Sequence, residues 1–138
     1  MIQILCVPPD LCKPVLAKCK ATILRGLDVA EMDEAELIER LSNKTALLWL
    51  IMRDDDVLAL GFTERIPEDD AVAVFGLAGR DMWRWAKLFA DRITDYAAAE
   101  GCERVLFAGS KAWGRIIPHA AHIGTTRGQE IFERRTLQ

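Results

Sequence analysis

Hydrophobic positions in the first part of the chain recur at helical spacing. Residues 8–26 open with a Pro-Pro-Asp start and then place an apolar residue at every fourth position, which predicts a helix ending around Gly26. Asp33 followed by Glu36 matches a capping box and predicts a second, short helix over residues 33–41. The intervening residues 27–32 are expected to form a linker or a bent loop.

The middle of the chain changes to continuous apolar runs separated by short polar segments. Residues 46–52, 57–66 and 71–77 are rich in large apolar side chains, and polar turns at 53–56 and 67–70 separate them. Runs of this length and content are typical of buried strands. Three strands joined by short turns predict an antiparallel meander.

A long amphipathic stretch follows over residues 81–100. We expect Asp81 to cap its start and Gly101 to end it. At 1.5 Å per residue such a helix spans about 30 Å, enough to cross a sheet. The apolar stripe on this helix is predicted to contain Trp85, Leu88, Phe89, Ile93, Tyr96 and Ala97.

The last part of the chain alternates short strands and turns. Residues 104–108 predict a strand parallel to the one at 71–77, because a strand–helix–strand unit crosses over that way. A short helix at 112–117 and two strands, 122–126 and 130–137, complete the order. With no repeat or domain break, the pattern predicts one α/β (α+β) domain over residues 1–138 with a mixed sheet and a C-terminal hairpin.

Composition narrows the function classes. The chain has 51% hydrophobic and 28% charged residues, as expected for a globular domain, and its net charge of −3 disfavours a nucleic-acid-binding protein. No apolar run approaches the roughly 20 residues of a membrane span. The N-terminus lacks a basic secretion signal, so we expect an intracellular protein with reduced thiols.

Metal binding is not expected. The cysteines form no C-x-x-C pair, and only two histidines could assist them. The acidic turn at 54–56 lacks an EF-hand pattern and is interpreted as solvated. Cys19 and Cys102 are expected to be small buried hydrophobes.

The segment from Gly79 to Ala86 combines a strand end, a short loop and a helix start. Free backbone N–H groups and the helix dipole at such a point favour an anion. Here Asp81, Trp83 and Trp85 stand where a phosphate loop would have glycines. Two interpretations stay open: an N-cap with two packed tryptophans, or a modified anion pocket.

Two sequence segments resemble a known family. Residues 95–105, D-Y-A-A-A-E-G-C-E-R-V, resemble the end of the long helix and the next strand of the GNAT fold, the Gcn5-related N-acetyltransferases. Residues 109–118, G-S-K-A-W-G-R-I-I-P, resemble the G-R-x-G-W-x-R-x-L segment of small GNAT-like proteins encoded by tailed phages and prophages. Ser110 replaces the arginine of that segment and Ala112 its glycine.

The resemblance implies acetyl-CoA as a cofactor. In GNAT enzymes its pantetheine lies between splayed strands, and its pyrophosphate lies on a Q/R-x-x-G-x-G/A loop. That loop aligns with residues 81–86, where only Ala86 agrees. A carboxylate at Asp81 about 4 Å from a diphosphate would cost about 4 kcal/mol at an effective dielectric near 20. The candidate cofactor-binding residues are Leu77, Gly79, Arg80, Arg84 and Ala86.

The resemblance also implies a general base and an acid for acetyl transfer. The candidates for these roles are Glu64, Ser110 and His119, with His122 as a further substitute for the acid. The single tyrosine, Tyr96, is expected in the core.

Two functions follow from the resemblance. The favoured one is a non-catalytic GNAT-fold protein with a degenerate coenzyme loop. It would be a virion-associated or accessory protein that binds phage structural or other proteins, or forms an oligomer. The alternative is an N-acetyltransferase that transfers acetyl from acetyl-CoA to an amine. The expected location is the cytoplasm of the bacterial host, or the virion.

Overall fold

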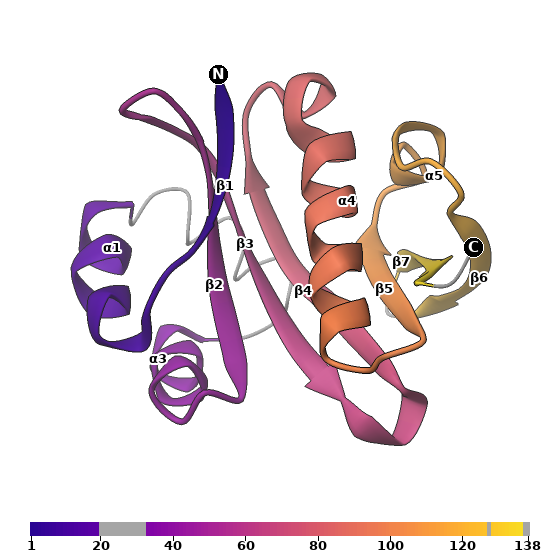
Figure 1. Cartoon of the computed structure of the whole chain (residues 1–138), viewed down its shortest axis with the longest axis horizontal. Helices are drawn as coiled ribbons and strands as arrows, with labels where there is room; N and C mark the ends of the chain where they lie inside the picture. Colours follow the sequence, from indigo (N-terminus) through magenta and orange to yellow (C-terminus); the bar gives the residue numbers. More distant parts are fainter. Residues whose placement is uncertain (20–32, 127, 137–138) are drawn as a thin grey trace. The chain divides into compact units, whose positions relative to one another are not determined.

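The computed structural model describes residues 1–19, 33–126 and 128–136 (Figure 1). Its strands form a seven-stranded mixed sheet in the order β1-β2-β3-β4-β5-β7-β6. The chain divides into two compact units, one of residues 1–64 and 75–81 and the other of residues 65–74 and 82–138. The helix predicted over residues 8–26 ends at Lys18, earlier than expected, with Cys19 as its C-cap. Gly26, the linker at 27–32 and the turn residue Arg127 lie outside the described residues.

Three strands pair in the first unit. β1 (Ile2–Cys6) pairs antiparallel with β2 (Ala46–Arg53), which pairs antiparallel with β3 (Asp56–Ile66). The meander prediction is confirmed for β2 and β3. No strand is predicted before Pro8, although Ile2, Ile4 and Cys6 alternate as strand residues do. The strand signal of β1 is weak because it has five residues and three of them are exposed.

Helices cover one face of these strands (Figure 1). A 3-10 turn (Pro9–Leu11) leads into α1 (Cys12–Lys18), and α3 (Glu34–Ser42) packs against β2. The Asp33 side chain accepts a hydrogen bond from the Glu36 N–H at 2.7 Å, which confirms that cap. The core between helices and strands contains Val7, Cys12, Leu16, Leu37, Leu41, Ala46, Leu48, Leu50, Leu60 and Phe62.

β4 (Ala71–Gly79) contributes to both units. In the second unit its first part runs parallel to β5 (Arg104–Gly109), with Ala71 opposite Arg104 and Val74 opposite Phe107. This confirms the predicted parallel crossover. In the first unit its second part lies against β3, where the Phe62 and Phe75 rings stack with centroids 5.8 Å apart.

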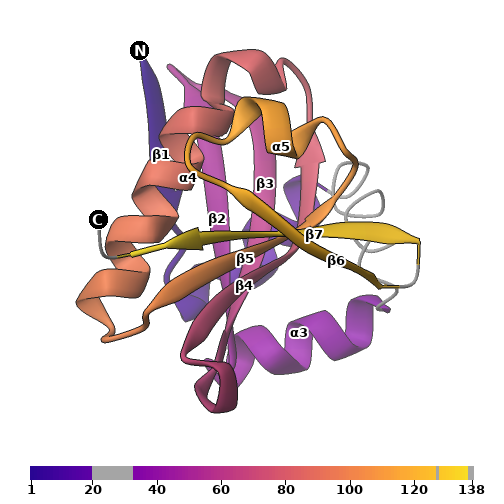
Figure 2. The ribbon, with the colours of Figure 1, turned by 90° about the vertical axis from the view of Figure 1, so that its right-hand side faces the viewer.

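A hairpin and two helices complete the second unit (Figure 2). β7 (Gln129–Arg135) pairs antiparallel with both β5 and β6 (Ala121–Thr126). α5 (Trp113–Ile116) lies beside this hairpin. α4 (Met82–Ala99) packs against β5.

The buried face of α4 differs in part from the predicted stripe. Trp85, Phe89, Ile93 and Ala97 are buried, but Leu88 is 46% exposed. Ala86, Ala90 and Thr94 take its place, because the buried face is centred one position further along the helix. Gly101 ends the helix with a φ of 77°, as predicted.

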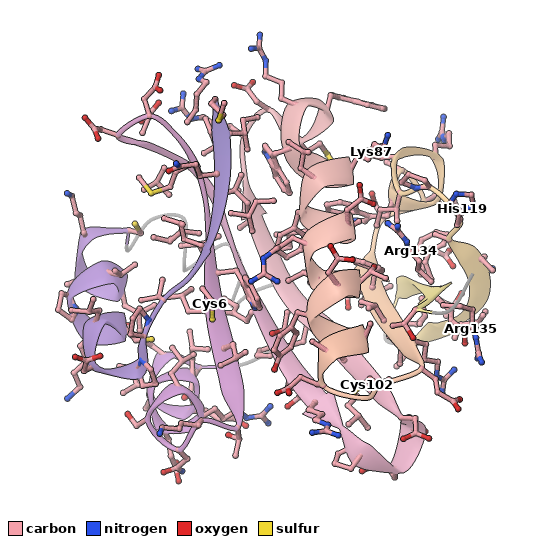
Figure 3. The ribbon with its side chains drawn as sticks, in the orientation of Figure 1. Cys6, Lys87, Cys102, His119, Arg134 and Arg135 are labelled. Carbon is pink, nitrogen blue, oxygen red and sulfur yellow. The ribbon has the colours of Figure 1, made fainter. Side chains whose placement is uncertain are left out.

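A buried arginine connects α4 to the sheet. Arg134 on β7 lies beside α4 (Figure 3), and its Nη1 atom lies 2.8 Å from Oδ1 of Asp91. Its Nε has no hydrogen-bond partner among the described residues. Removing Asp91 would therefore leave a buried charge uncompensated.

Candidate functional site

The end of β4 packs closely on β3. A Cβ atom added at Gly79 would lie 2.2 Å from the Cβ of Ala59 and 2.5 Å from the carbonyl oxygen of Leu58. The next N–H group, of Arg80, donates to that same carbonyl at 2.9 Å. Gly79 is therefore required by strand packing, and the Arg80 N–H is already bonded within the protein.

The Arg80 side chain also has a partner. Its guanidinium pairs with Asp56 in the turn between β2 and β3. Both side chains are more than half exposed, so the pair contributes little to stability. A neighbouring turn residue, Asp54, lies 3.8 Å from the N-terminal ammonium of Met1.

Asp81 does not have the backbone that the sequence analysis predicted for a helix cap. Its φ is 58°, in the left-handed region, whereas the N-cap Asp33 is extended with φ −87° and ψ 163°. Left-handed backbone at a non-glycine residue costs roughly 1–3 kcal/mol, and aspartate tolerates it better than most residues. Asp81 therefore makes the sharp turn from β4 into α4.

The first turn of α4 divides into a buried and an exposed face. Trp85 and Ala86 are buried, with 2% and 1% exposure. Trp83 is 75% exposed, so the expectation that both tryptophans pack is wrong for Trp83. Arg84 is also exposed. Of the cofactor candidates in this turn, Arg84 alone presents a side chain to solvent, while Leu77 on β4 is half-buried.

Aromatic contacts connect the start of α4 to the hairpin. The Trp85 and Trp113 rings have centroids 6.3 Å apart. A Cβ at Gly109 would lie 2.5 Å from Nε1 of Trp113, and one at Gly114 would lie 2.6 Å from the Phe132 ring. These two close ring contacts explain why the segment at 109–118 has glycine at both positions of its G-x-x-x-W-G part.

An open pocket of about 350 Å³ lies on the hairpin in the second unit. Its lining comes from the loop after β5 and from both strands of the hairpin. Phe132 is buried and supplies an apolar wall, with the His122 ring 5.4 Å from it, centroid to centroid. The residues that line this pocket are Lys111, His122, Thr125, Glu130 and Phe132.

Two side chains bond one carboxylate oxygen in this pocket. Nε2 of His122 lies 2.6 Å from Oε2 of Glu130, and the Thr125 hydroxyl donates to the same oxygen at 2.8 Å. The hydrogen bond from Thr125 lowers the pKa of Glu130, and the His122 bond and the Lys111 charge lower it further. An ionised carboxylate only accepts, so Nε2 of His122 carries a proton in this bond, and in the neutral imidazole Nδ1 is then an acceptor.

A β-bulge produces this arrangement. Residues three apart on a regular strand point to opposite faces. The pairing of β6 with β7 shifts between His122 and Gly124, so that His122 lies opposite Phe132 while Thr125 lies opposite Glu130. The extra residue, Ile123, brings His122 and Thr125 to the same face.

The catalytic candidates belong to different units of the chain. Glu64 lies in the first unit and pairs with Arg40 at 2.8 Å, which accounts for its charge without a catalytic role. Ser110 is exposed beside the pocket residue Lys111. His119 is exposed, with a φ of 62°, between α5 and β6 (Figure 3). His122, which the sequence analysis gave only as a substitute, is the histidine with a carboxylate partner.

Other site types find no support in the part of the chain that the structure describes. It contains no group of three or more His, Cys, Asp or Glu residues that could hold a metal ion. No helix among residues 1–19, 33–126 and 128–136 has the length and apolar content needed to cross a membrane.

No family model and no curated protein matches this sequence. Solved structures do match. An aminoglycoside 6'-acetyltransferase type Ii has a TM-score of 0.75 at 10% identity, with 99% of this chain and 98% of that chain covered. A GNAT-family acetyltransferase from Staphylococcus aureus Mu50 has a TM-score of 0.67 at 10% identity and 99% coverage of both chains.

A third structure holds a coenzyme. The PaiA N-acetyltransferase from Thermoplasma acidophilum, solved with coenzyme A, has a TM-score of 0.63 at 10% identity, covering 98% of this chain and 99% of that one. At such identities the likeness concerns the fold. The mixed α/β sheet, the crossover helix and the terminal hairpin predicted from the sequence are confirmed, and this chain has the fold of GNAT acetyltransferases.

Proposed function

We propose that this chain is an N-acyltransferase that uses acetyl-CoA to acylate a small amine in the hairpin pocket. The observation that carries the proposal is the hydrogen-bonded pair of His122 and Glu130 in an open pocket of a GNAT-fold protein. A histidine held by a carboxylate, with its second nitrogen available, is an arrangement suited to general-base catalysis.

The residues at the start of α4 fit the coenzyme's diphosphate in part. Gly79 and the Arg80 N–H do not, because β3 already occupies both. The first turn of the 18-residue α4 offers backbone N–H groups, and Arg84 is exposed with no ion pair to a described residue. Arg84 and the helix start would therefore hold the diphosphate.

The coenzyme, when bound, would supply the acetyl group as a thioester, so that an N–C bond forms as the C–S bond breaks and the sulfur leaves as a thiolate, which afterwards takes up the proton. Nδ1 of His122 takes the proton that the amine loses. Glu130 keeps the imidazole oriented through Nε2 and stabilises the imidazolium that results. Thr125 fixes the carboxylate through the same oxygen.

The residues at the start of α4 favour a second function, namely protein binding without transferase activity. Asp81 places a negative charge at the helix start. Ala59 fills the space beside Gly79 through which a phosphate would have to reach the backbone. Trp83 is 75% exposed beside Arg84, as in many protein interfaces. In this function the chain would contact phage structural or other proteins.

Calorimetry and an acyl-transfer assay separate the two functions. Acetyl-CoA at 100 times its dissociation constant should stabilise the fold by about 2.7 kcal/mol. Loss of a general base lowers kcat by about 10²- to 10⁴-fold, the effect expected for His122→Gln. His119→Gln is the matched comparison, because it removes an imidazole that does not line the pocket.

Two results would contradict acyl transfer. One is the absence of any thermal shift or heat at millimolar acetyl-CoA, which would leave the binding function. The other is an equal loss of rate in the His122 and His119 variants, which would place the base elsewhere.

A further inference from the structure

We infer that the amine acylated by this protein carries a carboxylate, so that the acceptor is a small amino acid rather than a simple amine or a polyamine. The inference rests on the proposed acyl transfer and concerns which amines the hairpin pocket selects. It comes from the opposite charges of two pocket residues, Glu130 and Lys111.

Glu130 offers one carboxylate oxygen to a ligand. Both protein donors, His122 and Thr125, bond Oε2. Among the described residues no donor reaches Oε1. An ammonium group can therefore bond Oε1 within the pocket that His122 also lines.

Lys111 supplies the complementary charge. Its ammonium forms no ion pair with a residue in the described ranges, yet it lines the same pocket and is near enough to act on the Glu130 charge. A carboxylate on the substrate would give Lys111 its partner. A polyamine would instead bring a second positive charge towards it.

The position of Lys111 is held by packing. Its carbonyl accepts a hydrogen bond from the Gly114 N–H at 3.2 Å. Two residues later, the ring of Trp113 packs on Gly109 and on Trp85. A cation on a loop fixed in this way loses less conformational freedom on binding than one on a free loop.

The size of the pocket limits the substrate. About 350 Å³ lies at the lower end of the volumes of small-molecule sites, about 300–1,000 Å³. Phe132 provides the apolar surface for a short hydrocarbon segment between the two charged groups. These features together describe a compact zwitterion.

Matched pairs of compounds test the inference directly. Glycine, β-alanine and 4-aminobutyrate are compared with methylamine, ethylamine and propylamine, which lack only the carboxylate. Binding is measured by NMR titration without coenzyme, and acyl transfer by thiol release from acetyl-CoA. We expect at least one amino acid to bind about fivefold or more tightly than its matched amine, the size of a good ion pair.

Variants assign the preference to Lys111. Lys111→Met should remove it, and Lys111→Arg should retain it. Lys13→Met is the control, because it removes the same charge from α1 in the other unit. Circular dichroism melting shows whether each variant is folded.

The outcomes distinguish the two proposals. Equal binding and transfer for amino acids and matched amines, or a preference that survives Lys111→Met, overturns the inference while acyl transfer stands. Lys111-dependent binding of amino acids without any transfer overturns the proposed function and retains the pocket's selectivity for zwitterions.

Discussion

His122 and Thr125 bond the same oxygen of Glu130 although they lie three residues apart on one strand. The bulge at Ile123 makes this possible by reversing the side-chain alternation of β6. Ile123 itself is half exposed, so its main contribution is to the register of the strand.

Deleting Ile123 should therefore keep His122 bonded to Glu130, because His122 and Thr125 would lie two residues apart on a regular strand and so on one face. Deleting both Ile123 and Gly124 makes His122 and Thr125 adjacent, which turns His122 away from the carboxylate. NMR of the His122 ring would report the hydrogen bond in both variants. Acyl transfer should fall in the double deletion as far as it does in His122→Gln, and a bond that survives the double deletion would contradict this register.

The two tryptophans of the first α4 turn should differ in their effect on stability. Trp85→Ala removes a buried ring that contacts Phe89 and Trp113, and large-to-small changes of this kind cost about 3–5 kcal/mol. Trp83→Ala removes an exposed ring and should stay within about 0.5 kcal/mol of the native protein. Urea unfolding of both variants measures the difference, and similar losses would contradict the assigned faces of α4.

Glu130 should contribute to the pH dependence of stability. The Thr125 hydrogen bond, the His122 hydrogen bond and the Lys111 charge lower its pKa in the folded protein below the ordinary value of 4.5. A carboxyl with a lowered folded pKa stabilises the protein above its unfolded pKa, and the contribution disappears as the pH falls through the folded pKa.

Glu130→Gln should consequently be less stable than the native protein near neutral pH, and the difference should vanish on the acid side. Melting temperatures from pH 7 down to about pH 3 measure this convergence. Thr125→Val should show a smaller effect in the same direction. A constant difference at every pH would mean that packing, rather than ionisation, causes the loss.

Asp81→Asn should strengthen coenzyme binding. Asparagine tolerates left-handed backbone as aspartate does, so the turn at φ 58° is retained while the charge is removed. Loss of a like charge near a diphosphate favours binding by up to about 4 kcal/mol at close range, less where solvent screens it. Arg84→Glu should act in the opposite direction, and calorimetry with acetyl-CoA compares the two. Weaker binding by Asp81→Asn and stronger binding by Arg84→Glu would show that the diphosphate does not bind at this helix start.

Local patterns in the sequence determined most of the elements. The spacing in α4, the apolar runs of β2, β3 and β4, and the Asp33–Glu36 cap depend on residues a few positions apart, so they can be found without the fold. The parallel pairing of β4 and β5 follows from chirality. The exposure of Trp83 also had a local signal, because residues two apart cannot share one helix face.

The candidate site was decided by contacts between segments distant in the sequence. Gly79 is needed because of Ala59, and no local pattern connects a glycine to a residue on another strand. The pair of His122 and Glu130 depends on a one-residue bulge, and the exposed, polar β6 strand has no hydrophobic pattern that specifies its register. The sequence determined which elements form, because local spacing controls them; the tertiary structure alone decided which polar groups meet, because strand register and close packing bring them together.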